Sequence, residues 1–192
     1  MNDTELIALI IQKNETAFKA LVEAYKHKVY NTCIGMLQNG EDAEEVTQDV
    51  FIEIYEAVGK FDQRSSLSTW IYRIAINKSL DKLRHNKRKK RFGKIVRLFQ
   101  SDKDDSILNR PNFIHPGVQL EQKELSVILF KAIDQLAEKQ KTAYLLHNIE
   151  GVSYQEISEI METTVSSVES LLFRAKDNLK KLLGDYYQKN YK

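Results

Sequence analysis

The chain has 192 residues, of which 42% are hydrophobic and 29% charged, and its formal net charge is +2. This composition predicts a soluble chain with one or two cored domains, and the net charge alone is too small to indicate nucleic acid. The single Cys33 excludes an internal disulfide and fits a reducing compartment. Since Met1 begins no charged and then apolar leader, and no apolar run approaches ~18 residues, we expect a cytoplasmic protein with no membrane insertion of its own.

Only two prolines and seven glycines interrupt a chain rich in helix-forming residues, which predicts an all-α fold. The first helix is expected to begin at Asp3 or Thr4. A second is expected to start after Asn14 and to end at Asn39 and Gly40.

The third predicted helix, residues 42–58, contains no Lys or Arg. Its core stripe consists of Val46, Val50, Phe51, Ile54 and Val58. The charged residues of its outer face are all acidic. Such a face suggests a basic partner, although a merely solvated acidic surface is the plain alternative.

A polar loop at residues 59–68 precedes a fourth helix capped by Ser66 or Ser68. Trp70, Arg73, Asn77 and Arg84 fall within one angular band of this helix, so an aromatic ring, an amide and two guanidinium groups share an edge. These groups stack on bases, bond base edges and hold phosphate, whereas the alternative is a Trp in the core. The basic run from Lys82 to Arg97 continues the edge and resembles a phosphate-binding footprint; a solvated helix end is the plainer interpretation.

Residues 93–120 are expected to be a flexible linker, because the helical pattern decays from Gly93 and prolines follow. Regular helix returns and leads to residues 151–183, which read as a helix-turn-helix. Ser153 is expected to cap its first helix, and Thr163 or Thr164 its second. The alternative is an ordinary helical hairpin in a bundle.

The motifs of common catalytic and metal sites are missing: the chain has no glycine-rich phosphate loop, HExxH, CxxC or G-x-S-x-G. Its four histidines are isolated. We therefore expect no enzyme, no metal site and no cofactor.

Four segments together resemble the extracytoplasmic-function (ECF) group of bacterial RNA polymerase sigma factors, in the sigma-70 family. They are DAEEVTQDVF (42–51), STWIYRIAIN (68–77), GVSYQEI (151–157) and VSSVESLLFRA (165–175). The resemblance implies two small helical domains joined by a linker: sigma region 2 at 1–92 and sigma region 4, with the helix-turn-helix, at 121–187. Such a subunit binds core polymerase, recognises −35 and −10 promoter elements and assists strand opening.

By this resemblance, the residues divide among three surfaces. The polymerase-binding residues are Asp42, Glu45, Gln48, Asp49 and Phe51. The −10 DNA-binding residues are Asp62, Gln63, Arg64, Ser65, Trp70, Arg73, Asn77, Lys78 and Arg84. The −35 DNA-binding residues are Ser166, Ser167, Ser170, Arg174 and Lys176. The implied partners are core RNA polymerase, through its β′ clamp and β flap regions, promoter DNA and an anti-sigma factor.

The chain departs from the family's common pattern at three positions: Glu162 replaces a frequent turn glycine, and Glu169 and Leu171 replace frequent basic residues. We expect these changes to alter −35 recognition. The alternative function is a free-standing helix-turn-helix regulator that binds duplex DNA without polymerase; a helical protein-interaction module is a third possibility.

Overall fold

The computed structural model describes residues 2–99 and 123–190, and within these ranges the regular elements are all helical. They are α1 (Asp3–Ile11), α2 (Glu15–Leu37), α3 (Gly40–Ala57), a 3₁₀ turn (Val58–Lys60), α4 (Leu67–Phe99), α5 (Lys123–Asp134), α6 (Glu138–Tyr144), a π-helical turn (Leu145–Ile149), α7 (Tyr154–Ile160) and α8 (Val165–Asn190). The predicted all-α class with two helical domains is confirmed. Among the described residues, none of the helices is long and apolar enough to cross a membrane.

Asparagine side chains begin the first three helices. The Oδ1 atoms of Asn14 and Asn39 accept the backbone N–H groups of Ala17 and Asp42 at 3.0 and 2.9 Å. Asn14 was predicted for this role, but Asn39 begins α3 instead of ending α2, whose C-cap is Gln38 in a left-handed conformation (φ 51°). The first cap is Asn2, not Asp3 or Thr4, because Asn2 forms a reciprocal capping box with Glu5.

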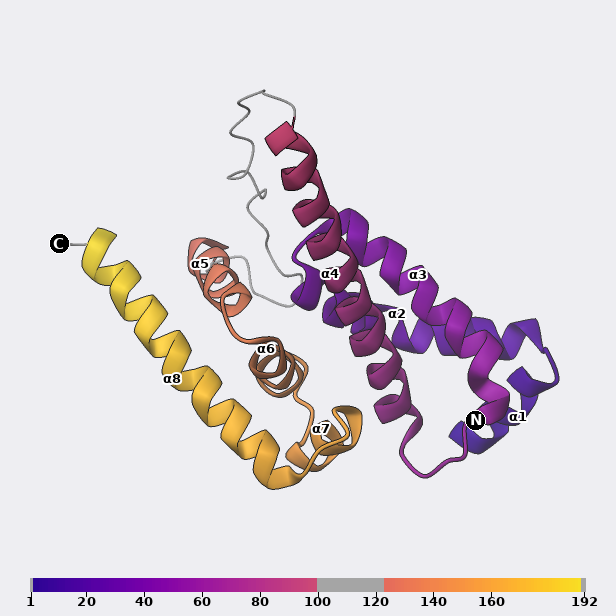
Figure 1. Cartoon of the computed structure of the whole chain (residues 1–192). Helices are drawn as coiled ribbons and strands as arrows, with labels where there is room; N and C mark the ends of the chain where they lie inside the picture. The colour runs from indigo at the N-terminus through magenta and orange to yellow at the C-terminus, as the bar shows by residue number, and fades with distance from the viewer. Residues whose placement is uncertain (1, 100–122, 191–192) are drawn as a thin grey trace.

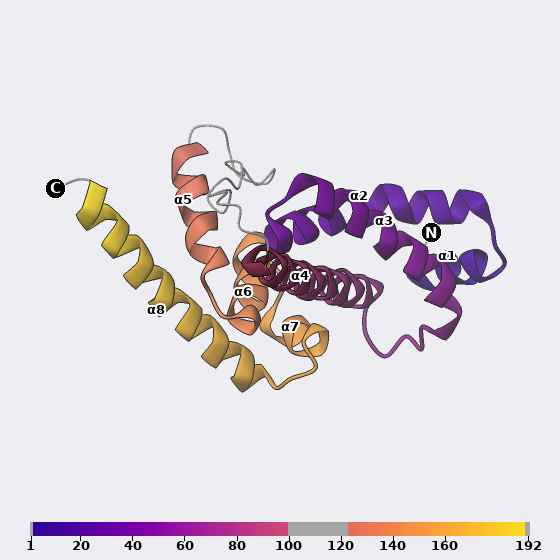
Figure 2. The same cartoon turned by 45° about the horizontal axis from the view of Figure 1, so that its top comes forward.

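α2, α3 and α4 pack together into the core of the N-terminal domain. Leu21, Val50 and Ile54 have no exposed surface, and Ile71 of α4 is 1% exposed. α4 lies between α2 and α3 on one side and the C-terminal helices α6 and α7 on the other (Figures 1 and 2). α4 and the end of α2 are therefore the elements of the N-terminal domain that contact the C-terminal domain.

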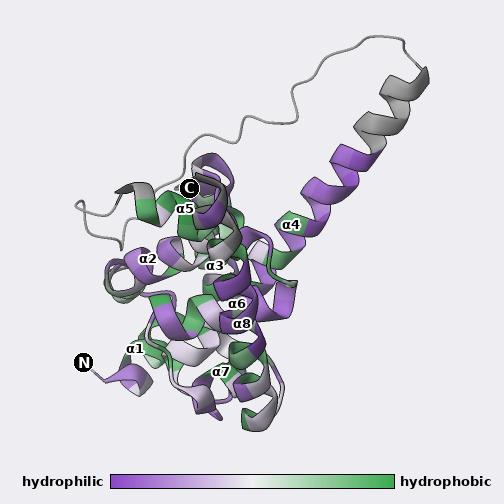
Figure 3. Ribbon diagram, turned by 90° about the vertical axis from the view of Figure 1, so that its left-hand side faces the viewer, coloured by the Kyte–Doolittle hydropathy of each residue, from purple (hydrophilic) through white to green (hydrophobic). Residues whose placement is uncertain are grey.

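α4 is longer than predicted, because it continues past Gly93 to Phe99. A single glycine costs a helix only about 1 kcal/mol, and good helix formers precede it, so the helix continues through residues 93–99, where the linker was predicted to begin. The hydrophilic part of α4 extends beyond the packed helices (Figure 3). The remainder of the predicted linker, 100–120, including Asp102, Asp104 and Asp105, lies outside the described residues.

The C-terminal domain contains the predicted helix-turn-helix. Ser153 forms a capping box with Glu156 at the start of α7, and the Oγ1 atom of Thr164 accepts the backbone N–H of Ser167 at 3.1 Å. The apolar stripe of α8 faces inward, with Val168 and Ala175 fully buried. α8 therefore keeps a second, polar face turned to solvent.

Candidate nucleic-acid interface

The loop before α4 is held by short-range hydrogen bonds. The Ser66 Oγ atom accepts the Thr69 backbone N–H at 3.0 Å, so it is the cap that begins α4. Within the loop, Asp62 accepts the Arg64 backbone N–H at 3.3 Å and pairs with the Arg64 Nε atom at 3.0 Å. Gln63, between them, adopts a left-handed φ of 57°. These contacts shape the loop into a compact turn that leaves Gln63 and Arg64 exposed.

A pocket of about 430 Å³ opens between this loop and α4. Its lining residues are Lys60, Phe61, Asp62, Arg64, Ser65, Trp70, Arg73 and Glu159. The Trp70 ring is half-buried and lies against the Phe61 ring, with 5.0 Å between centroids. The structure thus brings five of the nine predicted −10 residues to one pocket, which combines aromatic and cationic groups.

The remaining α4 residues of that set are spread along the helix. Asn77 is exposed. The Lys78 ammonium lies 2.6 Å from a Glu53 carboxylate oxygen, and this hydrogen bond raises the lysine's pKa. The Arg84 guanidinium pairs with Asp81 and, across the domain boundary, with Glu138, each at 3.2 Å. In this arrangement Lys78 and Arg84 bind carboxylates of their own chain, so only Asn77 of these three presents its polar group openly.

Arg73 is directed at the C-terminal domain. Its Nη2 atom donates to the Glu159 carbonyl oxygen at 2.9 Å, and its Nη1 atom lies 3.6 Å from a Glu162 carboxylate oxygen. Its Nε atom is buried and forms no hydrogen bond with the described residues. The guanidinium is therefore bound to α7 and the following turn, at the edge of the pocket.

The acidic face of α3 is partly neutralised by α4. The Lys82 ammonium lies 3.3 Å from Asp42 and 2.5 Å from Glu45, and Asn86 donates to Asp42 at 2.9 Å. The hydrogen bond to Glu45 is the main reason that the pKa of Lys82 is raised. The first turns of the acidic α3 face therefore pair with Lys82 of the same chain. Helical periodicity alone did not predict this contact.

Farther along α3, the exposed surface becomes apolar. Gln48 and Asp49 are exposed, and Phe51 is half-buried in a groove of about 550 Å³ that it shares with Ile52 and Tyr55. Ile52 is 56% and Tyr55 40% exposed. Neither residue was assigned a role from the sequence; the available signal was an Ile on an otherwise polar helix face.

The outer face of α8 carries the predicted −35 residues. Ser166, Ser170, Arg174 and Lys176 are exposed, and Ser167 is half-buried beside its cap. Phe173 is 74% exposed and shares a shallow pocket with Glu169, Ser170 and Arg174. It was missed because aromatic residues usually pack inward, although its position beside Arg174 on the polar face was the available signal.

Two of the unusual positions of the helix-turn-helix differ in orientation. Glu169 is exposed on the outer face of α8, whereas Leu171 is half-buried and packs against the core. The loss of a cation on the outer face is therefore due to Glu169, and Leu171 contributes to packing instead.

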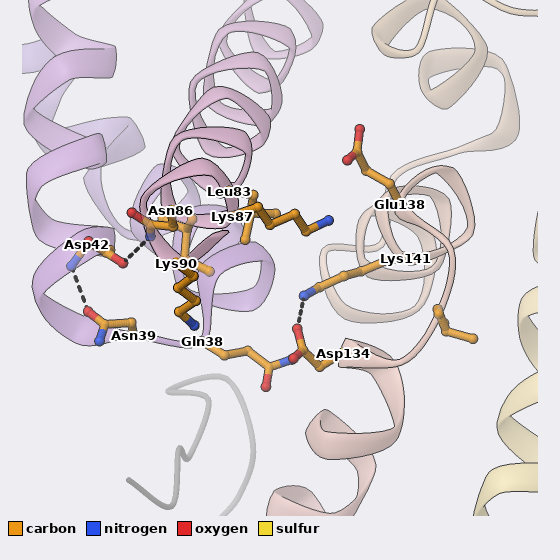
Figure 4. A pocket seen from close by; sticks show the side chains of 12 residues that line it. Gln38, Asn39, Asp42, Leu83, Asn86, Lys87, Lys90, Asp134, Glu138 and Lys141 are labelled. Atoms are coloured by element: carbon orange, nitrogen blue, oxygen red, sulfur yellow. Dashed lines mark hydrogen bonds and ion pairs between the residues drawn. The ribbon is translucent and has the colours of Figure 1, made fainter. Parts of the chain in front are cut away.

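A second pocket, of about 350 Å³, lies between the domains (Figure 4). In it, Lys141, which is 4% exposed, pairs with Asp134 at 2.8 Å, and the Lys87 ammonium points into the same space from α4. No group of three or more His, Cys, Asp or Glu residues that could hold a metal ion occurs in the parts of the chain that the structure describes.

Two family models match the chain: sigma-70 region 2 at residues 21–89 and sigma-70 region 4 at residues 126–179. The chain is 31% identical over 176 residues to the ECF RNA polymerase sigma factor SigW of Bacillus subtilis, covering 90% of this chain and 91% of that protein. This chain belongs to the ECF group of sigma-70 family RNA polymerase sigma factors. It is also 30% identical to the ECF RNA polymerase sigma-E factor of Escherichia coli, over 92% of each chain. With the RNA polymerase sigma-H factor of Pseudomonas aeruginosa the identity is 29%, over 94% of this chain and 93% of that protein.

Two solved structures resemble this ECF sigma factor in fold. One is the sigma factor RpoE of Bartonella quintana in complex with the anti-sigma factor NepR, with a TM-score of 0.68 and 22% identity over 87% of this chain and 96% of that one. The other is CnrH in complex with the cytosolic domain of CnrY, with a TM-score of 0.67 and 21% identity over 95% of this chain and 97% of that one. At these identities the likeness concerns the fold alone.

Proposed function

We propose that this chain is a cytoplasmic, non-catalytic subunit that binds core RNA polymerase, recognises −35 and −10 promoter elements and assists strand opening. One observation carries the proposal. A single chain with sigma region 2 and region 4 matches presents an acidic and apolar α3 face, a pocket beside Trp70 and a helix-turn-helix with an exposed recognition helix.

The α3 face is the proposed contact with the polymerase β′ clamp, through Asp42, Glu45, Gln48, Asp49 and Phe51. Exposed carboxylates attract a basic surface, and the apolar groove beside Phe51 offers area to bury. Because Lys82 already binds Asp42 and Glu45, Asp49 is the sharper test. Asp49→Lys should weaken core binding and leave the helical circular dichroism unchanged, whereas Glu23→Lys, on an exposed face of α2, should bind core normally.

The pocket beside Trp70 is the proposed site for the −10 strand. Opening a duplex costs a few kcal/mol for each unstacked base, and a pocket with a stacking surface offsets that cost by about 1–3 kcal/mol per base. The loop Asp62 to Ser65 with Trp70 and Arg73 supplies the pocket, while Asn77, Lys78 and Arg84 extend the surface along α4. Asn77→Ala should slow open-complex formation more than it weakens core binding; equal losses would contradict the assignment.

The outer face of α8 is the proposed −35 reader, with the C-terminal domain held on the polymerase β flap. Ser166, Ser170, Arg174 and Lys176 offer donors to base edges and phosphates, Ser167 stands beside them, and Phe173 offers an apolar contact of the kind that thymine methyl groups accept. Glu169 on the same face opposes the negative field of DNA. We therefore expect −35 recognition by α8 to depend on few phosphate contacts.

Transcription with purified components tests the whole proposal. The chain is mixed with core polymerase and a promoter library, and the transcripts are mapped. We expect specific start sites that require the chain. If the chain neither binds core polymerase nor redirects initiation, the proposal is wrong. Tight binding of duplex DNA without polymerase would instead identify the alternative, a free-standing regulator.

An anti-sigma partner is also proposed. One structural neighbour was solved with the anti-sigma factor NepR, and the other, CnrH, with the cytosolic domain of CnrY. A helical inhibitor of this chain would bury its own surface in the apolar α3 groove and in the interdomain pocket.

A further inference from the structure

The turn between α7 and α8 contains an unfavourable backbone conformation. Glu162 has a φ of +50°, in the left-handed region where a side chain with a Cβ is disfavoured and glycine is preferred. Three other non-glycine residues of the described chain share such a φ, and of these four Gln38 and Glu162 contact the other domain, Gln38 through the Phe130 carbonyl oxygen and Glu162 through Arg73. Non-glycine residues held in this conformation cluster at functional sites, so the contacts of the Glu162 side chain are relevant.

The Glu162 side chain reaches the N-terminal domain. Its carboxylate lies 3.6 Å from the Arg73 Nη1 atom, while the preceding helix supplies the Glu159 carbonyl oxygen to Nη2 at 2.9 Å. The Arg73 side chain is 31% exposed, and its Nε atom is buried without a hydrogen bond to the described residues. A guanidinium that keeps one buried N–H unpaired is bound incompletely, so another acceptor can compete for it.

Glu159 lies at the same place. It lines the pocket together with Trp70 and Arg73, and its Oε1 atom accepts Gln155 Nε2 at 3.2 Å, which holds it beside α7. The Glu159 carbonyl oxygen and the Glu162 carboxylate therefore both bind Arg73, at the edge of the pocket to which the proposed −10 strand would bring its phosphates. Carboxylate and phosphate oxygens compete for guanidinium groups through the same charge-assisted hydrogen bonds.

Other interdomain contacts hold this arrangement together. The Gln38 Nε2 atom donates to the Phe130 carbonyl oxygen at 2.8 Å in a buried setting, and Arg84 pairs with Glu138 at 3.2 Å. α4, which carries Arg73 and Arg84, lies between α2 and α3 on one side and α6 and α7 on the other (Figures 1 and 2). All of these contacts are made within one chain.

We propose that Glu159 and Glu162 act as an intramolecular substitute for DNA: they dock the C-terminal domain on the Arg73 surface of α4 and keep it closed until the domains separate. The assignment of the Arg73 surface to −10 DNA rests on the proposed function, whereas the contact between the two domains does not. Because only the open form can bind polymerase and DNA together, the closed form lowers the apparent affinity for core by the fraction of chains that are open.

Small-angle X-ray scattering and core-binding titrations on the full chain test this proposal. A compact chain of 192 residues has a radius of gyration of about 16 Å. Glu162→Gly should raise the radius and tighten apparent core binding about two- to fivefold, the range expected for losing one partly exposed ion pair. Because glycine suits the positive φ, the melting temperature should stay equal or rise, which separates opening from damage to the fold.

Two further variants complete the test. Glu159→Gln combined with Glu162→Gln removes both charges without the glycine and should open the chain as well. Asp177→Asn, which removes an exposed pair with Lys181 on α8, is the matched control and should change neither the radius nor core binding. If the Glu162 and Glu159 variants keep the wild-type radius and core affinity, the proposal is overturned. If these variants open the chain but neither they nor the wild type supports transcription, the interdomain contact is confirmed and the proposed function is wrong.

Discussion

Glu150 is a half-buried carboxylate at the boundary between the domains, and it makes stability depend on pH. Burial raises its pKa from 4.5 to about 7, although the Tyr72 hydroxyl, which donates to it at 3.4 Å, and Lys28 act in the opposite direction. Glu156 and Tyr25 are the other titratable groups near this pair. The folded chain therefore favours neutral Glu150, and stability present below pH 4.5 is lost as the pH rises through about 7.

The magnitude follows from the shift. A change from 4.5 to about 7 corresponds to at most about 3.4 kcal/mol, and because the side chain is only half-buried, solvent screening reduces this to about 1–2 kcal/mol. Glu150→Gln keeps the shape and an acceptor for Tyr72 but cannot ionise. We therefore expect the variant to exceed wild type in free energy of unfolding by about 1–2 kcal/mol at pH 8, and by much less at pH 5.

Urea unfolding followed by circular dichroism between pH 5 and pH 8 measures this difference. Tyr72→Phe is the companion variant: it removes the hydroxyl that lowers the pKa of Glu150, so it should steepen the loss of stability above neutral pH. If wild type and Glu150→Gln lose stability in parallel across this range, burial of an ionisable Glu150 is not what governs the pH dependence, and the reasoning is refuted.

Three further predictions concern single positions. Ser66→Ala removes the cap of α4 and should lower the free energy of unfolding by about 1 kcal/mol, measured by urea titration, with Ser68→Ala as the control. Gly151→Ala forces a Cβ onto a φ of +71° and should cost about 1 kcal/mol in the same assay, although no neighbouring atom obstructs it; an unchanged stability would contradict this. Phe173→Ala should leave stability within about 0.5 kcal/mol and weaken promoter binding by holoenzyme by about 1 kcal/mol, as seen in a gel-shift titration.

The sequence by itself determined the helices and most of their starting points. The caps at Asn14, Ser66 and Ser153 were predictable because each side chain bonds a backbone N–H three residues ahead, so the whole motif is local. The buried stripe of α8 was equally accessible, since helical periodicity fixes which residues share a face. The order of the family motifs identified the class of protein for the same reason: it is a property of the linear chain.

Only the tertiary structure decided how the two domains face each other. The pairs Lys82 with Glu45 and Arg73 with Glu159 lie 37 and 86 residues apart, and no periodicity links them. Packing also placed Leu171 against the core and left Phe173 exposed, although both residues are apolar and are neighbours of the buried Leu172. The physical reason is that a side chain's partner depends on the angle and spacing at which helices pack, which the chain settles only when the apolar stripes of all helices are buried together.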